Sequence, residues 1–96
     1  MGHHKPDAQT GRIPDASAIR GLLNEGTAHL QAGRFQEADG AYRRALDLAP
    51  NHPEALHHLG LLLYRLNRFD DAIATISRAI EQAPASPLYW FNLGVV

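Results

Sequence analysis

The residues best placed to do chemistry in this chain are three polar side chains that recur at one spacing. Asn24, His58 and Asn92 are separated by 34 residues, and each stands two residues before a glycine. An amide offers a hydrogen-bond donor and an acceptor together, and a neutral imidazole does the same. This column of residues could therefore form paired hydrogen bonds with a ligand. The alternative is that its members are ordinary solvated residues on a helix face.

Residue sets for catalysis or metal binding do not stand out in the sequence. His57 and His58 are adjacent, so on a helix they point about 100° apart and cannot share a metal as an i, i+4 pair can. His3 and His4 are adjacent in a polar stretch, where two histidines are weak ligands without further donors. No nucleophile–base set, phosphate-binding glycine loop or zinc spacing occurs. We therefore predict no enzyme activity, no cofactor and no metal.

The spacing of 34 residues extends to the framework that must position these side chains. The positions that share a residue type at this spacing are Gly26, Gly60 and Gly94; Phe35 and Phe69; Ala38 and Ala72; Ala45 and Ala79; Pro50 and Pro84; Pro53 and Pro87; Leu59 and Leu93. Such a period is typical of proteins built from stacked repeats. The apolar residues within each period predict helices over about residues 14–32, 35–48, 53–66 and 69–82, and from 87 onward.

The repeated residue types have steric reasons. Glycine and alanine are expected where two helices cross closely, because a larger side chain would push them apart. Larger side chains are expected to fill the space between the helices, at Phe35, Tyr42, Leu59, Phe69 and Ile76. Proline ends a helix and also suits the first turn of the next one. Each period is therefore expected to be one hairpin of two helices.

The pattern resembles the tetratricopeptide repeat. The central unit carries Leu59-Gly60, Ala72 with Ile76, Ala79 and Pro84; the upstream unit carries Gly26, Ala38 with Tyr42, Ala45 and Pro50; the downstream unit begins with Trp90, Leu93 and Gly94. The resemblance covers residues 19–96. One departure is Glu25 at the place of Leu59 and Leu93, which makes the first helix more polar, as expected of a helix with no repeat before it.

The resemblance implies an all-α solenoid, a right-handed superhelix whose concave groove is lined by the first helix of each unit. In the repeat arrays of O-GlcNAc transferases, asparagines at the places of Asn24, His58 and Asn92 bind the backbone of an extended peptide. The neighbouring groove residues expected to contact a partner are Leu23, Thr27, His57, Leu61, Arg65 and Phe91. A different subclass grips a C-terminal carboxylate with lysine, asparagine and arginine. The lysines and arginine are absent from the matching places here, so we expect no binding of chaperone tails.

Composition limits the partners and the location. The net charge is −1 at pH 7, which gives no overall attraction to nucleic acid or to an anionic membrane. There is no cysteine, which is compatible with the cytoplasm. No apolar run approaches the ~20 residues that span a bilayer. We expect a cytoplasmic protein of bacterial origin that binds a protein or peptide, with neither nucleic acid nor membrane as a partner.

The predicted domain organisation is a disordered polar tail over residues 1–14 and a repeat domain over residues 15–96. Its units are residues 19–52, residues 53–86 and a partial unit, 87–96, so two full repeats are followed by the first helix of a third. Because roughly three repeats are normally needed for stability, the domain is expected to be marginal. The last helix is also strongly apolar, whereas a terminal cap should have a polar outer face.

These observations favour a non-enzymatic module that binds a peptide or partner protein in the concave groove. Replacing Asn24 or Asn92 with alanine is expected to weaken binding without loss of helicity. One alternative is the substrate-recruiting N-terminal fragment of a larger enzyme such as a glycosyltransferase, which a stop codon directly after Val96 would exclude. Another is an oligomerisation module that pairs through Trp90, Phe91, Val95 and Val96.

Overall fold

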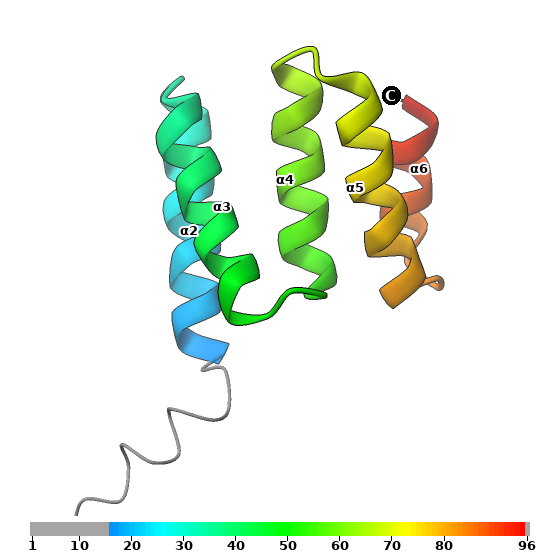
Figure 1. Cartoon of the computed structure of the whole chain (residues 1–96), viewed down its shortest axis with the longest axis horizontal. Coiled ribbons are helices and arrows are strands. Elements are labelled where there is room, and N and C mark those ends of the chain that lie inside the picture. The colour runs from blue at the N-terminus through cyan, green and yellow to red at the C-terminus, as the bar shows by residue number, and fades with distance from the viewer. Residues whose placement is uncertain (1–15, 96) are drawn as a thin grey trace, which may run out of the picture.

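The computed structural model describes residues 16–95, and this part of the chain folds into helices without strands. In order these are α2 (Ala16–Gln31), α3 (Phe35–Leu48), α4 (Pro53–Arg65), α5 (Phe69–Gln82) and α6 (Pro87–Val95). Figure 1 shows them as neighbouring antiparallel rods that follow one another across the molecule. The bounds of α3 and α5 are those predicted from the sequence. The predicted tail, 1–14, and Val96 lie outside the described residues.

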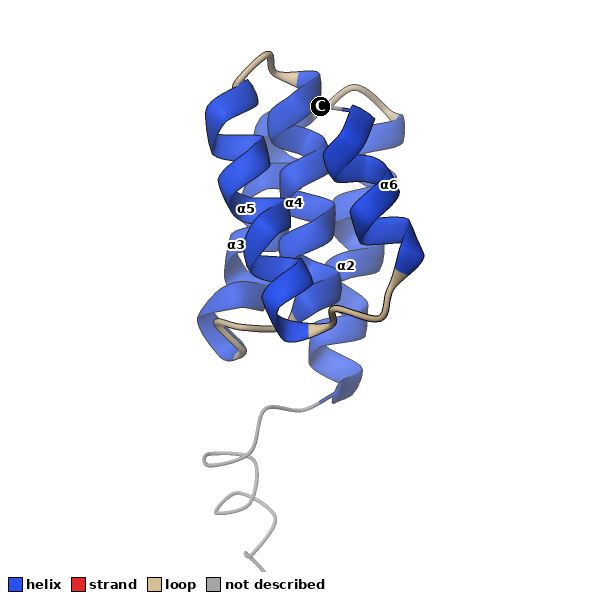
Figure 2. Cartoon of the chain, turned by 90° about the vertical axis from the view of Figure 1, so that its right-hand side faces the viewer, coloured by secondary structure: helices blue, strands red, loops and turns tan. Residues whose placement is uncertain are grey.

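The helices form the solenoid arrangement that the repeat predicts. Viewed from the side, α3 and α5 lie on one side of the molecule and α2 and α6 on the other, with α4 between them (Figure 2). The pairs α2–α3 and α4–α5 make the most extensive contacts, and α3 packs on α4 to join the two units. The all-α solenoid of helical hairpins is therefore confirmed.

Backbone geometry recurs with the sequence period. Arg34 and Arg68, which precede α3 and α5, have φ, ψ values of −91°, 76° and −96°, 72°. Ala49 and Ala83, which follow these helices, have φ of −144° and −143°. The turn before each second helix contains a residue with positive φ, Gly33 at 79° and Asn67 at 62°. Glycine and asparagine are the residues that tolerate this left-handed conformation best, so the two turns are alike despite their different residues.

The helix-crossing positions behave as their small residues predict. A Cβ atom added to Gly26 would overlap the ring of Tyr42, and one added to Gly60 would overlap the side chain of Ile76. Both large side chains are completely buried. The core around them is made by Ile19, Leu23, Ala38, Ala41, Ala45, Ala55, Leu56, Leu59, Leu62, Leu63, Ala72, Ala79 and Ile80.

One predicted core residue is not in the core. Phe69 is 44% exposed, because it lies in the first turn of α5 at the edge of the hairpin. Its ring packs edge-on against Tyr64, with 5.4 Å between the ring centroids. Phe35, at the equivalent place, is half-buried. The aromatic residue at this position therefore covers the turn and does not fill the space between the helices.

The connection between the two full units is capped as the sequence indicates. His52 is the N-cap of α4, and its Nδ1 accepts a hydrogen bond from the Ala55 N–H at 3.3 Å. Pro53 occupies the first turn, where a missing N–H costs nothing. Arg78 of α5 donates to the carbonyl oxygen of Pro50 at 3.1 Å, so the second unit also holds the connection. These contacts fix how α4 follows α3.

Candidate functional site

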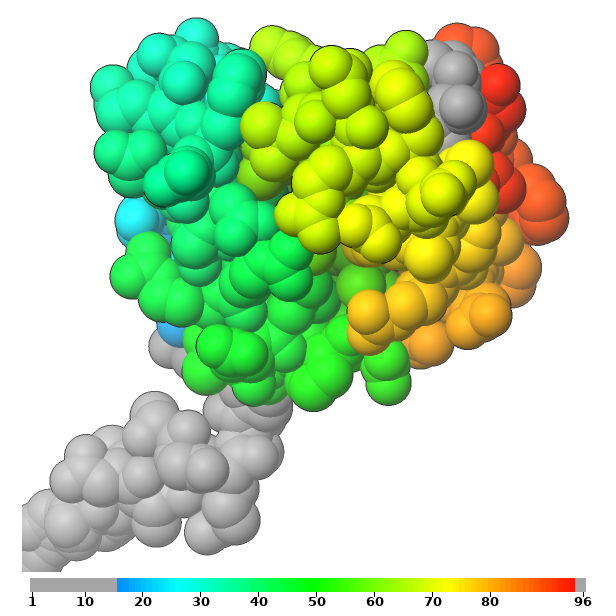
Figure 3. Space-filling view, turned by 45° about the horizontal axis from the view of Figure 1, so that its top comes forward, coloured from blue at the N-terminus to red at the C-terminus, as the bar shows by residue number. Residues whose placement is uncertain are grey.

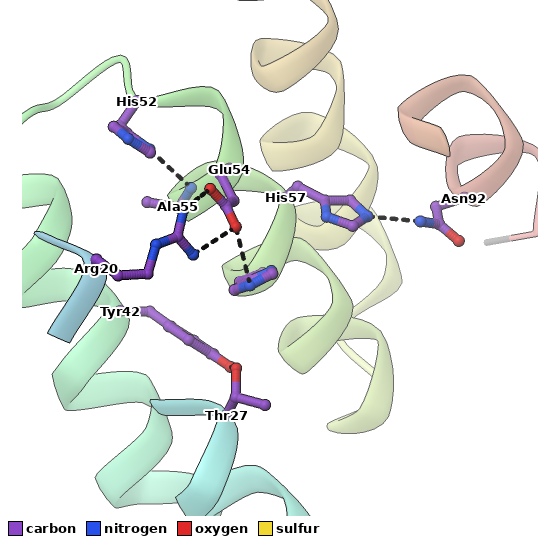
Figure 4. Close-up of polar contacts among 9 residues, drawn as sticks. Arg20, Thr27, Tyr42, His52, Glu54, Ala55, His57 and Asn92 are labelled. Carbon is purple, nitrogen blue, oxygen red and sulfur yellow. Dashed lines mark hydrogen bonds and ion pairs between the residues drawn. The ribbon is translucent and has the colours of Figure 1, made fainter. Parts of the chain in front are cut away.

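Two equivalent positions in successive units form the strongest polar contact on the α2–α4 side of the molecule. Arg20 of α2 and Glu54 of α4 are 34 residues apart, and the guanidinium donates to both carboxylate oxygens, at 2.8 and 2.6 Å (Figure 4). The hydrogen bond from Arg20 holds the pKa of Glu54 below its usual range, and the same bond raises the pKa of Arg20. The pair stays charged at neutral pH and ties the first helices of the two units together.

His58 extends this pair along the same face of α4. Its Nε2 is 4.0 Å from the Glu54 carboxylate, and its ring centroid is 5.5 Å from that of Tyr42. Burial is the largest cause of the lowered pKa of His58, which outweighs the attraction of Glu54. The imidazole is therefore neutral at pH 7 and keeps one donor and one acceptor. Its side chain is only partly buried and so reaches the surface.

Asn24 lies beside a hollow at the N-terminal half of α2. The hollow has a volume of about 620 Å³ and is lined by Ala16, Ser17, Ile19, Arg20, Gly21, Asn24 and His52. Asn24 is exposed, and its amide has no hydrogen-bond partner among residues 16–95. Ile19 at the base is buried, whereas Arg20 at the rim is exposed. A free amide beside an apolar floor and a charged rim can bind a polar backbone group.

Asn92 has a different environment from Asn24. Its amide Nδ2 contacts His57 Nε2 at 2.5 Å (Figure 4). An amide nitrogen can only donate, so Nε2 accepts and the His57 ring carries its proton on Nδ1. His57 is 4% exposed, and its ring also lies 4.8 Å from that of Tyr89. Asn92 and His57 therefore hold α6 against α4, and the amide of Asn92 is already occupied.

The electrostatics of His57 follow from this burial. Desolvation is the largest cause that lowers its pKa to about 4, and the neighbouring His58 lowers it further. A neutral ring is required for the contact with Asn92. The predicted role of His57 in the groove is thus replaced by a role in packing between repeats.

The remaining predicted site residues are divided between the core and the surface. Leu23 is 1% exposed and belongs to the core, so its side chain does not reach a partner. Thr27 is half-buried, and its hydroxyl lies 3.1 Å from the Tyr42 hydroxyl. Leu61 is half-buried and Arg65 is exposed, while Phe91 is 68% exposed. The side chain of Val95 lies outside the described residues.

The structure adds residues that the sequence reasoning left out of the site. Arg20 and Glu54 were placed on the groove face, but not as a pair. The signal was present, since opposite charges at the repeat spacing meet when first helices lie side by side. Glu25 likewise meets Arg44 of α3 at 2.8 Å, which explains how the first helix carries a polar residue in the place of Leu59.

A second hollow lies between α3 and α5, on the face shown in Figure 3. It has a volume of about 480 Å³ and is lined by Arg43, Leu46, Asp47, Pro50, Leu59, Leu63, Arg68, Asp71, Ala74, Thr75 and Arg78. Its charges are balanced locally, because Arg43 binds Asp39 and Arg68 binds Asp71. This hollow therefore offers no excess charge to a ligand.

Metal and membrane sites were also considered for residues 16–95. This part of the chain contains no group of three or more His, Cys, Asp or Glu side chains that could hold a metal ion. None of its helices combines the length and the hydropathy of a membrane-spanning segment. The surface residues around Asn24, Arg20, Glu54 and His58 are therefore the best candidate site, and we call them the α2–α4 site.

Comparison with known proteins agrees with this architecture. The model of the tetratricopeptide repeat matches residues 23–87 and again residues 57–96. Protein POLLENLESS 3-LIKE 2 of Arabidopsis thaliana is 41% identical over 64 residues, which are 67% of this chain and 15% of that protein. The Hsp70-Hsp90 organizing protein of Triticum aestivum is 33% identical over 60 residues, which are 62% of this chain and 10% of that protein. The chain thus spans less than a fifth of the length of either relative.

Proposed function

This chain belongs to the tetratricopeptide repeat family, and we propose that it is a non-enzymatic protein-interaction module that binds an extended segment of a partner at the α2–α4 site. The observation that carries the proposal is the unpartnered amide of Asn24, exposed beside a hollow with a buried apolar floor. A fold shared by many interaction modules does not name the partner. The chemistry of the site selects a polypeptide backbone with an apolar side chain next to it.

The mechanism is recognition by a preorganised surface. The Arg20–Glu54 pair and the caps of α4 hold α2 and α4 in place before a ligand arrives, so little ordering cost falls on the protein. Asn24 supplies a donor and an acceptor for one peptide unit, and the neutral His58 supplies another such pair. Leu61 and Phe91 extend the surface with apolar contacts along α4 and α6.

Replacing Asn24 with alanine should weaken binding of a selected peptide by about threefold to tenfold, since one or two hydrogen bonds of ordinary strength are lost. The peptide would come from a random extended-peptide library selected on the whole chain, and Kd would be measured by calorimetry. Gln36→Ala is the matched control, because Gln36 is an exposed amide on α3. Equal losses in both variants, or no loss in Asn24→Ala, would refute the site.

The name of the wheat relative refers to Hsp70 and Hsp90, but we do not propose a chaperone tail as the partner. A carboxylate clamp needs cationic side chains, and the matching places here hold Leu23, Thr27, His58, Leu88 and Asn92. Leu23 is buried and His58 is neutral at pH 7. The α2–α4 site therefore suits a backbone segment better than a free carboxylate.

Self-association through α6 is the second candidate function. Trp90 is 53% exposed and Phe91 is 68% exposed, and large exposed aromatic side chains are typical of contact surfaces. Of the other two residues in this proposal, the side chain of Val95 and all of Val96 lie outside the described residues. Size-exclusion chromatography with light scattering on the wild type and on Phe91→Asp tests it. A dimer that dissociates in the variant would support self-association, and a monomeric wild type at its highest soluble concentration would exclude it.

The third candidate, a recruiting segment of a larger enzyme such as a glycosyltransferase, is supported only by the column of Asn24, His58 and Asn92. The amide of Asn92 is engaged by His57, which weakens that column as a continuous peptide-binding surface. Neither relative is named as a glycosyltransferase. We therefore place it last.

A further inference from the structure

One position of the repeat is filled twice in this molecule and is open the third time. Gly26 of α2 lies directly under Tyr42, and Gly60 of α4 lies directly under Ile76. Gly94 occupies the same place in α6, and an added Cβ would meet nothing within 4 Å. The space that a second helix fills in the first two units is therefore vacant beside α6.

The residues around Gly94 are exposed in the same way. Trp90 is the equivalent of Leu56, which is completely buried beneath α5, whereas the Trp90 ring is about half exposed. Leu93 is the equivalent of Leu59, which is buried, and Leu93 is only half-buried. The indole of Trp90 donates to the carbonyl oxygen of Pro84 at 2.8 Å, which holds the ring in place. We call the surface of Trp90, Leu93 and Gly94 the open face of α6.

The molecule itself shows what covers such a face. The helices that cover α2 and α4 carry a large apolar residue between two alanines, as Ala38, Tyr42 and Ala45 in α3 and as Ala72, Ile76 and Ala79 in α5; all six are buried. The alanines allow close approach, and the large residue lies over the glycine. Because α6 has no charged residue, shape and apolar contact decide which helix fits.

We propose that the open face of α6 binds an amphipathic helix of a partner protein that carries this motif, alanine, then a large apolar residue four positions later, then alanine three positions after that. A second copy of the chain does not fit as well. Its two helices with the motif are already buried against their own α2 and α4, and it could donate one only by opening its own hairpin. This site is separate from the α2–α4 site and does not depend on it.

The probe is a synthetic peptide with the sequence of α5, Phe69–Gln82, with both ends blocked. The chain has a single tryptophan, Trp90, which lies in the proposed site and reports directly on its burial. Adding the peptide to the whole chain should shift tryptophan emission to shorter wavelength in a saturable manner. We expect a Kd on the order of 100 µM, because a short isolated helix must be ordered on binding.

Gly94→Leu is the decisive variant. In the free chain its side chain would enter open space, so helicity and the unfolding midpoint should not fall. In the complex it would occupy the place of Ile76 of the peptide, so affinity should fall at least about tenfold. A peptide with Ile76→Asp should also fail to bind the wild-type chain, because a charge would be buried beside Gly94.

Saturable binding that is lost in Gly94→Leu and with the altered peptide would support the proposal. No shift at millimolar peptide would overturn it, and so would equal binding by wild type and Gly94→Leu, which would place the peptide elsewhere on the molecule. A blue shift that grows with the concentration of the chain alone would also overturn it, because a second copy would then cover the open face. A failure at Asn24→Ala has no bearing on these outcomes, so the two sites are tested independently.

Discussion

Replacing Gly60 with leucine is expected to lower the midpoint of thermal unfolding by about 10 °C or more, because overpacking a closed core costs a few kcal/mol in a domain of this size. The new Cβ would overlap Ile76 Cγ1 and lie 3.5 Å from the carbonyl oxygen of Ala72. Ile76 is completely buried, so it has no free space to move into. Relief requires α4 and α5 to move apart, which would uncover the centre of the core.

Gly21→Leu is the matched control for this change. Gly21 also lies inside a helix, but it is exposed, and an added Cβ would meet nothing within 4 Å. Leucine has a higher helix propensity than glycine by about 1 kcal/mol, so this variant should unfold at the same or a higher temperature. Circular dichroism melts of the wild type and both variants decide the matter. If Gly60→Leu melts with or above the wild type, the close crossing of α4 and α5 is wrong.

Lowering the pH from about 7 to about 4 should reduce the free energy of unfolding by an amount on the order of 3 kcal/mol through His57 alone. The pKa of His57 is about 4 in the folded chain, because the ring is buried, against 6.5 for an unperturbed histidine. Between these values the unfolded chain binds a proton that the folded chain does not. The contribution of His57 is therefore complete above about pH 6.5 and is lost as the pH falls toward 4.

His57→Leu tests this assignment, because the equivalent place in the first unit is Leu23, which is buried. Urea unfolding at several pH values should give a shallower decline for the variant than for the wild type. The lowered pKa values of His58 and Glu54 also reduce stability as the pH falls, but both groups are present in the two chains. Parallel pH profiles for wild type and variant would show that His57 is not buried in a neutral form.

The framework of the fold was predictable from sequence because each repeated residue has a local reason. Gly33 predicts a left-handed turn, Pro53 a helix start, and Gly26 and Gly60 the close crossing of two helices. These requirements depend on the residue and its immediate partners, so a period of 34 residues transmits them from one unit to the next. The matching dihedral angles at Arg34 and Arg68 show the same repetition in the backbone.

The candidate site was less predictable because it depends on how the units face one another. Asn24, His58 and Asn92 share one register, but only the three-dimensional arrangement brings His57 against Asn92 and leaves Asn24 without a partner. Leu23 and His57 were predicted on the groove and are buried instead, because α4 and α6 cover more of the preceding helix than their spacing indicates. The division into residues 1–14 and 15–96, the cytoplasmic location and the bacterial origin stay predictions.

The equivalence of positions also explains the exposed side chains of α6. Phe91 stands where His57 stands in α4, and Trp90 where Leu56 stands. His57 is covered by α6, and Leu56 is buried in its own hairpin. Phe91 and Trp90 have neither cover within residues 16–95. Two of the three candidate contact surfaces of the chain thus lie on one short helix, and they differ in which flank of that helix they use.

The most direct test of the central claim is to map a selected peptide on the isotope-labelled whole chain by nuclear magnetic resonance. Binding at the α2–α4 site predicts that the largest amide shift changes fall at Arg20, Asn24, Glu54 and His58, and that α3 and α5 change little. Changes concentrated on Arg43, Asp47 and Arg78, which line the hollow between α3 and α5, would contradict the account.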